Sequence, residues 1–170
     1  LLENGADPNL LSLVDPNDRY GPEGMLPLSS ACHSKHSIKF VKLLIKYGAN
    51  VNDDRATLPI FAAALNNDKQ KIEYLLEYGA DINRLQDGFR TVITAEATAG
   101  KWPMVLWLLD KGADPMKAGK NKSNVAVWVQ ERMDGTGLTE DGERVKARLE
   151  SIGVKFPYRP VRKNRVKSDE

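Results

Sequence analysis

The residues best suited to chemistry lie in one short segment, Cys32-His33-Ser34-Lys35-His36. A thiol beside an imidazole can form a nucleophile–base pair, in which the histidine takes the proton from the sulfur. Such a nucleophile needs an exposed, electropositive setting that favours the thiolate. Cys32 instead falls at a position where small residues recur along the chain, so we expect it to be a buried structural cysteine.

The sequence gives little support for a metal site or a phosphate-binding loop. The chain has one cysteine and two histidines, so a zinc site would need carboxylates to complete four ligands, and no usual ligand spacing is present. Neither standard glycine-rich phosphate loop occurs. We therefore expect no enzymatic activity, no catalytic residue, no metal and no cofactor. His33 and His36 are predicted to lie on the surface, in a loop between two helices.

The elements that position these residues are repeated. The pattern Gly-Ala-Asp/Asn begins at Gly5, Gly48, Gly79 and Gly112, and a pair of Leu or Ile residues precedes each copy. Leu-Leu followed three residues later by Gly predicts a helix that ends in a left-handed cap, which glycine adopts without a Cβ clash. Each copy therefore marks the end of a helix.

Each of the later copies also has an upstream half, at residues 26–32, 58–64 and 91–97. Two of these halves carry a proline near their start, where a helix tolerates the missing N–H. Small residues follow, which allow two helices to approach closely. The sequence thus predicts helix–turn–helix units with a period of 31 to 43 residues, measured between the glycines.

Together the two halves resemble the ankyrin repeat, Thr-Pro-Leu-His-x-Ala-Ala followed by Leu-Leu-x-x-Gly-Ala-Asp, over roughly residues 1–116. The resemblance implies an all-α solenoid of stacked helix–turn–helix units. The histidine of the family is replaced by Ser29, Phe61 and Thr94. Because that histidine normally joins neighbouring turns by hydrogen bonds, we expect weaker coupling between repeats than in a consensus array.

We expect one ankyrin domain over residues 1–157. Val125–Val129 is predicted to be the last unit's first helix, and Thr139 or Asp141 to cap its second helix; terminal units of a solenoid are generally atypical. The predicted parts are a partial first repeat at 1–10, repeats at about 26–52, 58–83 and 91–116, a degenerate cap at 123–157, and a basic, mobile tail at 158–170.

The charge distribution argues against nucleic-acid binding. The net charge is +2, but the segment from Arg159 to Glu170 holds five basic and two acidic residues. The rest of the chain is therefore nearly neutral, and the repeats show no basic stripe along which phosphates could lie. No apolar run approaches the length of a membrane span. We expect a monomer when no partner is bound.

The resemblance also implies binding to another protein through the concave face, which includes the turn tips at 15–24, 53–57, 84–90 and 117–122. Tyrosine and arginine dominate binding hot spots because they combine contact area with directed hydrogen bonds. Phe89 lies beside Gly88, where it either faces a partner or packs on the neighbouring turn. The candidate partner-binding residues are Tyr20, Arg55, Arg84, Asp87, Phe89, Arg90 and Lys122.

The predicted function is a non-enzymatic protein-binding scaffold. A narrower hypothesis comes from the lengthened last unit, which resembles small bacterial ankyrin proteins encoded beside type VI secretion toxins, notably phospholipase effectors. That resemblance implies an immunity protein that neutralises a secreted toxin in the periplasm. The alternative is a regulatory or anchoring module of a larger, cytoplasmic protein. The chain begins at Leu1, inside an expected helix, so we expect further residues upstream and the compartment stays open.

Overall fold

The computed structural model describes residues 1–12, 25–35 and 37–159 of the chain. In these residues a short 3-10 helix, η1 (Leu2–Asn4), precedes eight α-helices. The helices are α1 (Pro27–His33), α2 (Lys39–Lys46), α3 (Pro59–Leu65), α4 (Lys69–Glu77), α5 (Val92–Thr98), α6 (Trp102–Asp110), α7 (Val125–Asp134) and α8 (Glu140–Ser151).

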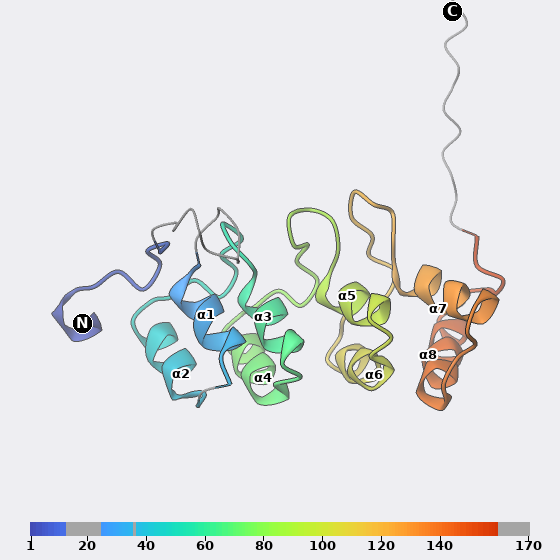
Figure 1. Ribbon diagram of the computed structural model, residues 1–170, viewed down its shortest axis with the longest axis horizontal. Helices are drawn as coiled ribbons and strands as arrows, with labels where there is room; N and C mark the ends of the chain where they lie inside the picture. Colours follow the sequence, from blue (N-terminus) through green and yellow to red (C-terminus); the bar gives the residue numbers. More distant parts are fainter. Residues whose placement is uncertain (13–24, 36, 160–170) are drawn as a thin grey trace, which may run out of the picture.

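The helices form four units that stack in a row. Within each unit consecutive helices pack together, as α1 with α2, α3 with α4, α5 with α6, and α7 with α8. The first helices α1, α3, α5 and α7 also contact one another in turn and form one layer, and the second helices form another layer below it in the view of Figure 1. The turns between units project from the side of the first layer (Figure 1). The expected all-α solenoid is confirmed.

The helix ends follow the local signals of the sequence. Gly5, Gly48, Gly79 and Gly112 all have φ between 85° and 88°, the left-handed conformation that only glycine adopts at little cost. At the other end of the helices, the Thr91 hydroxyl accepts a hydrogen bond from the backbone N–H of Thr94. Thr139 caps α8 in the same way. Of the two caps expected for α8, the structure therefore selects Thr139.

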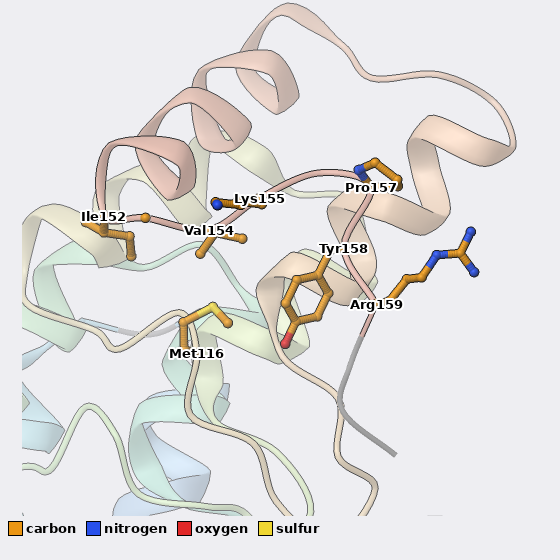
Figure 2. A pocket seen from close by; sticks show the side chains of 8 residues that line it. Met116, Ile152, Val154, Lys155, Pro157, Tyr158 and Arg159 are labelled. Carbon is orange, nitrogen blue, oxygen red and sulfur yellow. The ribbon is translucent and has the colours of Figure 1, made fainter. Parts of the chain in front are cut away.

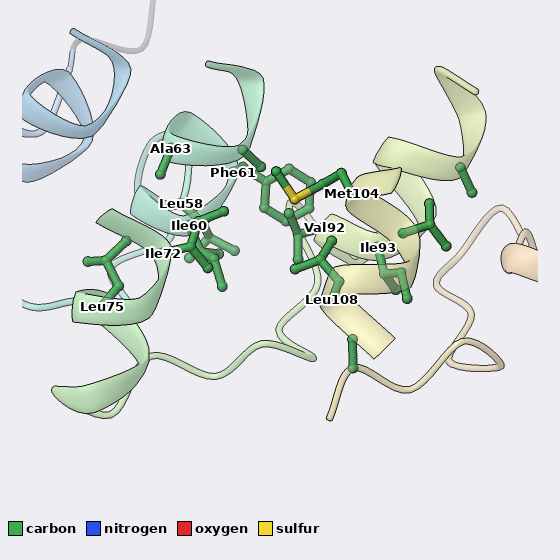
Figure 3. Close-up of a cluster of buried hydrophobic side chains, with 14 of the residues drawn as sticks. Leu58, Ile60, Phe61, Ala63, Ile72, Leu75, Val92, Ile93, Met104 and Leu108 are labelled. Atoms are coloured by element: carbon green, nitrogen blue, oxygen red, sulfur yellow. The ribbon is translucent and has the colours of Figure 1, made fainter. Parts of the chain in front are cut away.

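One continuous apolar core runs between the two layers. In the junction of the α3/α4 unit with the α5/α6 unit, large side chains gather: Phe61 of α3, Val92 of α5 and Met104 of α6 (Figure 3). Phe61 is 8% exposed. Phe61 thus takes the position of the family's histidine and contributes apolar packing there in place of a hydrogen bond.

The last unit closes the row. Val154, Phe156 and Tyr158 follow α8 and pack against the core. The Tyr158 hydroxyl accepts a hydrogen bond from Asn124 Nδ2 at 3.0 Å, and its backbone N–H donates to Gln130 Oε1 at 2.7 Å. Tyr158, the first residue of the expected tail, is therefore part of the packed cap.

Within the described residues, no helix has the length and apolar character needed to cross a membrane.

Candidate functional site: the turn tips

The first described tip, at residues 53–57, is held by an arginine–carboxylate pair. Arg55 Nη2 lies 2.5 Å from Asp53 Oδ2 and also donates to the backbone carbonyl of Asn9 at 2.9 Å. The guanidinium, which donates hydrogen bonds to the carboxylate, holds the pKa of Asp53 below its usual range. Arg55 thus ties this tip to the segment that follows η1, while about half of its side chain, 53%, stays exposed.

The second tip, at residues 84–90, is joined to the first by side chains. Arg84 Nη2 lies 2.8 Å from Asp54 Oδ2. Gln86 accepts a hydrogen bond from the backbone N–H of Leu58 at 2.7 Å. Gln86 Nε2 also donates to the backbone carbonyl of Ala56 at 3.4 Å. The two neighbouring tips are therefore connected by one exposed ion pair and by two partly buried hydrogen bonds of Gln86, which are better screened from solvent than the ion pair.

Residues 86–90 form a tight hairpin. The backbone N–H of Gln86 donates to the carbonyl of Arg90 at 2.9 Å, and the N–H of Phe89 donates to the carbonyl of Gln86. Both central residues, Asp87 and Gly88, have positive φ, 52° and 74°. This is the turn geometry for which an Asp-Gly pair is suited, since it matches the twist of the two arms.

The third tip, at residues 117–122, packs on this hairpin. The backbone N–H of Lys120 donates to the carbonyl of Gly88 at 2.9 Å, and the Lys120 ammonium lies 5.4 Å from the centre of the Phe89 ring. Phe89 remains 50% exposed, so it both touches the neighbouring turn and faces solvent. The exposed Lys122 follows in the same tip with φ of 55°.

The structure therefore sorts the candidate residues into two groups. Asp87, Phe89, Arg90 and Lys122 belong to two tips that pack on each other. Arg84 and Arg55 are both engaged by carboxylates of the first tip, so their exposed portions alone face a partner. The remaining candidate, Tyr20, and the enlarged turn at 15–24 lie outside the described residues.

A ladder of asparagines beneath the tips is absent from the sequence prediction. Asn52 donates from Nδ2 to the carbonyl of Gly79 at 2.8 Å and accepts from the N–H of Asp81 at 2.8 Å. Asn9 bonds the next unit in the same way, through Gly48 and Asn50, and Asn83 accepts from the N–H of Asp114. The available signal is an asparagine two residues after each of the first three Gly-Ala-Asp/Asn motifs.

The ladder stops at the fourth motif, where Met116 stands in place of asparagine. Met116 instead lines an open hollow of about 550 Å³ at the end of the array (Figure 2). The other lining residues come from the segment after α8, among them Val154 and Tyr158. This change from polar to apolar contact marks the boundary between the repeats and the cap.

The cysteine–histidine segment lies at the C-terminal end of α1. Cys32 is fully buried, and burial raises the pKa of its thiol to about 12, so the thiolate is scarce at neutral pH. His33 is the last residue of α1 and is exposed, which corrects its expected position in a loop. His36 lies outside the described residues. This segment therefore offers no activated nucleophile.

Replacement of the family's histidine does not remove all hydrogen bonding between turns. Ser29 Oγ donates to the backbone carbonyl of Thr57 at 2.5 Å, which joins α1 to the following tip. Thr94, by contrast, bonds within its own unit, to the hydroxyl of Thr91 at 3.0 Å. In the described residues no three of His, Cys, Asp and Glu come together as a metal site would require.

Comparison with known proteins shows which family the chain belongs to. The sequence profile of a family described as "Ankyrin repeats (3 copies)" matches residues 1–86, half of the chain. The chain belongs to the ankyrin repeat family. An ankyrin repeat protein of Fowlpox virus (strain NVSL) is 32% identical over 88 residues, which cover 50% of this chain and 13% of the relative. The chain thus spans a small part of that relative's length.

The ankyrin units continue beyond the matched residues. The helices from α5 to α8 lie after residue 86, yet they pack in the same paired arrangement, and Gly112 repeats the left-handed cap. Ankyrin repeats are in general non-catalytic modules that bind other proteins. The tips, which carry exposed residues such as Arg55, Phe89 and Lys122, are accordingly its candidate contact surface.

Proposed function

We propose that this ankyrin array is a scaffold that binds another protein through its turn tips. The observation that carries the proposal is the chain of contacts between consecutive tips, from Asp54 to Arg84 and from Gly88 to Lys120. Tips that are already fixed relative to one another lose little conformational entropy when a partner docks. A partner that spans them would bury about 800 Å² per side, the size of an ordinary specific interface.

Within this proposal the side chains have different tasks. Phe89 supplies exposed apolar area, and Arg90 and Lys122 supply charge on the same two tips. Arg55 offers its exposed half while Asp53 fixes its guanidinium. An arginine that is already oriented is well suited to a directed hydrogen bond with a partner.

A narrower form of the proposal makes the partner a secreted toxin, such as a type VI phospholipase effector, and this chain its immunity protein. Its support is the resemblance of the lengthened last unit, whose helices α7 and α8 are joined by residues 135–139. In this form the tips cover the active site of the toxin. Inhibition of phospholipid hydrolysis by the purified chain, at one chain per toxin, is the result that this form requires.

A second candidate function is supported by the viral relative. Since the matched region is 13% of that protein, the same kind of array also serves as one segment of a much longer polypeptide. The alternative is therefore a regulatory or anchoring module. An immunoblot of the source cells distinguishes the two, because a module predicts a band far above the 18.9 kDa of this chain.

The test of the scaffold proposal is capture of a partner by the wild-type chain and by two matched triple variants. The tip variant carries Arg55→Glu, Phe89→Asp and Arg90→Glu. The control variant carries Lys39→Glu, Tyr78→Asp and Arg148→Glu, three exposed positions on α2 and α8 and at the end of α4, which are second helices of their units. Both variants must first retain the thermal unfolding curve of the wild type.

We expect one protein to be captured by the wild type and the control variant and lost by the tip variant. If the tip variant still captures the protein and the control variant does not, the binding site lies on the second helices of the units. Equal capture by all three chains would leave the tips without a role in binding.

A further inference from the structure

Two adjacent tips form one composite surface, residues 84–90 and 117–122, which we call the tip pair. The backbone N–H of Lys120 donates to the carbonyl of Gly88. Gly119 lies so close to the hairpin that a Cβ at this position would stand 2.2 Å from the carbonyl oxygen of Phe89. The two tips are therefore a single fixed unit whose contact requires glycine at position 119.

The tip pair concentrates positive charge. It carries five cationic side chains and one carboxylate, that of Asp87, although the body of the chain is nearly neutral. Arg84 is paired with Asp54. The other four cations, Arg90, Lys117, Lys120 and Lys122, form no ion pair with any carboxylate of the described residues.

The neighbouring tip has the opposite character. Residues 53–57 carry two carboxylates and one arginine, and all three charged groups take part in ion pairs. The unpaired charge therefore belongs to the tip pair alone among the described tips. The near-neutral charge of the repeats as a whole conceals this difference between neighbouring tips.

An exposed aromatic ring lies on the tip pair beside one of these cations. Phe89 is 50% exposed, with the Lys120 ammonium 5.4 Å from the ring centre on the neighbouring tip. An exposed phenylalanine on a hairpin that is already rigid contributes apolar contact without a large entropic cost. The surface thus offers one exposed apolar ring on two tips that carry unpaired positive charge.

We propose that the tip pair binds an acidic protein segment that carries one apolar side chain, which packs on Phe89 while the carboxylates face the unpaired cations. This inference rests on the proposed scaffold function and specifies the chemistry of its partner. A nucleic acid is disfavoured because sequence-independent binding uses a groove that tracks many phosphates and several stacking aromatics. The tip pair has one exposed aromatic and two short loops.

The first experiment measures binding of the full chain to fluorescent probes by anisotropy. The probe is a short peptide of Glu and Asp with one central Phe. Three comparison probes are the same peptide with Ala in place of Phe, a peptide of Lys and Arg with the central Phe, and single-stranded oligothymidine. Salt is varied, since unpaired surface charges lose their attraction as ionic strength rises.

We expect the acidic Phe peptide to bind tightest, and its affinity to fall with salt. A chain with Arg90→Glu, Lys120→Glu and Lys122→Glu should bind it about tenfold more weakly or worse. A chain with Lys39→Glu, Arg144→Glu and Lys155→Glu has the same net charge and should bind as the wild type does. Phe89→Ala should weaken binding of the Phe peptide and leave that of the Ala peptide unchanged, which isolates the ring contact.

Tighter binding of oligothymidine than of the acidic peptide would overturn the inference, as would equal binding by the two triple variants. A second arm separates this outcome from failure of the scaffold proposal. A photo-crosslinking amino acid at Ala118, an exposed residue of the tip pair, captures the partner that the wild-type chain binds. An acidic crosslinked segment supports the inference; a neutral or basic one overturns it while the scaffold proposal stands.

Discussion

The ammonium of Lys71 donates a hydrogen bond to the backbone carbonyl oxygen of Ser34, 2.5 Å away in the preceding unit. The Lys71 side chain is only 1% exposed, and Asp68 Oδ2 lies 3.2 Å from the same ammonium. One buried lysine of α4 therefore bonds the C-terminal end of α1. This contact joins two units on the side of the array away from the tips.

Substitution of Lys71 by methionine keeps most of the apolar stem but removes this bond. We expect the Lys71→Met chain to lose about 2 kcal/mol of its free energy of unfolding, because hydrogen bonds to charged groups are among the stronger ones. Urea unfolding followed by circular dichroism measures the change. Lys35→Met, at an exposed position, is the control and should shift stability by less than about 0.5 kcal/mol. Equal stability of both variants would show that the buried ammonium gives no net stabilisation.

The asparagine ladder predicts a second effect on stability. Asn52→Ala removes the hydrogen bonds to the carbonyl of Gly79 and from the N–H of Asp81. We expect a loss of about 1–2 kcal/mol and faster hydrogen exchange at the Asp81 amide. Asn4→Ala, at an exposed asparagine of η1, serves as the matched control. Unchanged exchange at Asp81 would mean that other contacts hold the units in register.

The burial of Glu96 predicts that the stability of the fold depends on pH. Its side chain is 5% exposed, Oε2 forms no hydrogen bond, and Lys101 Nζ lies 3.4 Å away. Burial raises the pKa of the Glu96 carboxyl, against the opposing effect of Lys101. The folded chain therefore holds this proton more tightly than the unfolded chain does. The resulting stabilisation is present below the unfolded pKa and is lost as pH rises through the raised, folded pKa.

The Glu96→Gln chain should accordingly be more stable than wild type at neutral pH, by about 1 kcal/mol. The difference should shrink as pH falls toward the ordinary range of a glutamate pKa. Unfolding free energies measured across this range check both statements. Glu131→Gln, at an exposed position of α7, controls for the general effect of lost charge. A difference in unfolding free energy that stays constant with pH would show that titration of the Glu96 carboxyl is not its cause.

The backbone of the fold is predictable because its signals are local. The glycine of each Gly-Ala-Asp/Asn motif determines where a helix ends, and its left-handed φ follows from the missing Cβ. Thr139, the cap of α8, is one of the two caps that the sequence predicts. The paired helices and the stacking order then result from the repeat itself.

The relations between units are harder to predict, since they depend on which side chain meets which backbone group across the stack. Ser29 bonds Thr57, whereas Thr94, at the equivalent position, bonds within its own unit. Similarly, nothing in the order of residues pairs Lys120 with Phe89, because the two lie on successive tips. The sequence predicts the tips as candidates, but it does not indicate that two of them join into one surface.

The contact between these tips gives the last prediction. In Gly119→Ala the added methyl group would lie 2.2 Å from the carbonyl oxygen of Phe89, so the backbone of one tip must move. We expect a stability loss of about 1–3 kcal/mol, as for other overpacked sites. Separation of the tips also breaks the bond from the Lys120 N–H to the Gly88 carbonyl. Hydrogen exchange at the Lys120 amide should therefore accelerate more than exchange at the buried helix amides.

Ala118→Ser, at the exposed residue next to Gly119, provides the control and should change neither stability nor exchange. If the tip pair binds as one rigid surface, Gly119→Ala should also weaken binding of the acidic Phe peptide, although it alters no charge and no exposed side chain. Full binding by Gly119→Ala despite faster exchange at Lys120 would show that the two tips bind independently. In that case the fixed contact between them would stabilise the array without contributing to recognition.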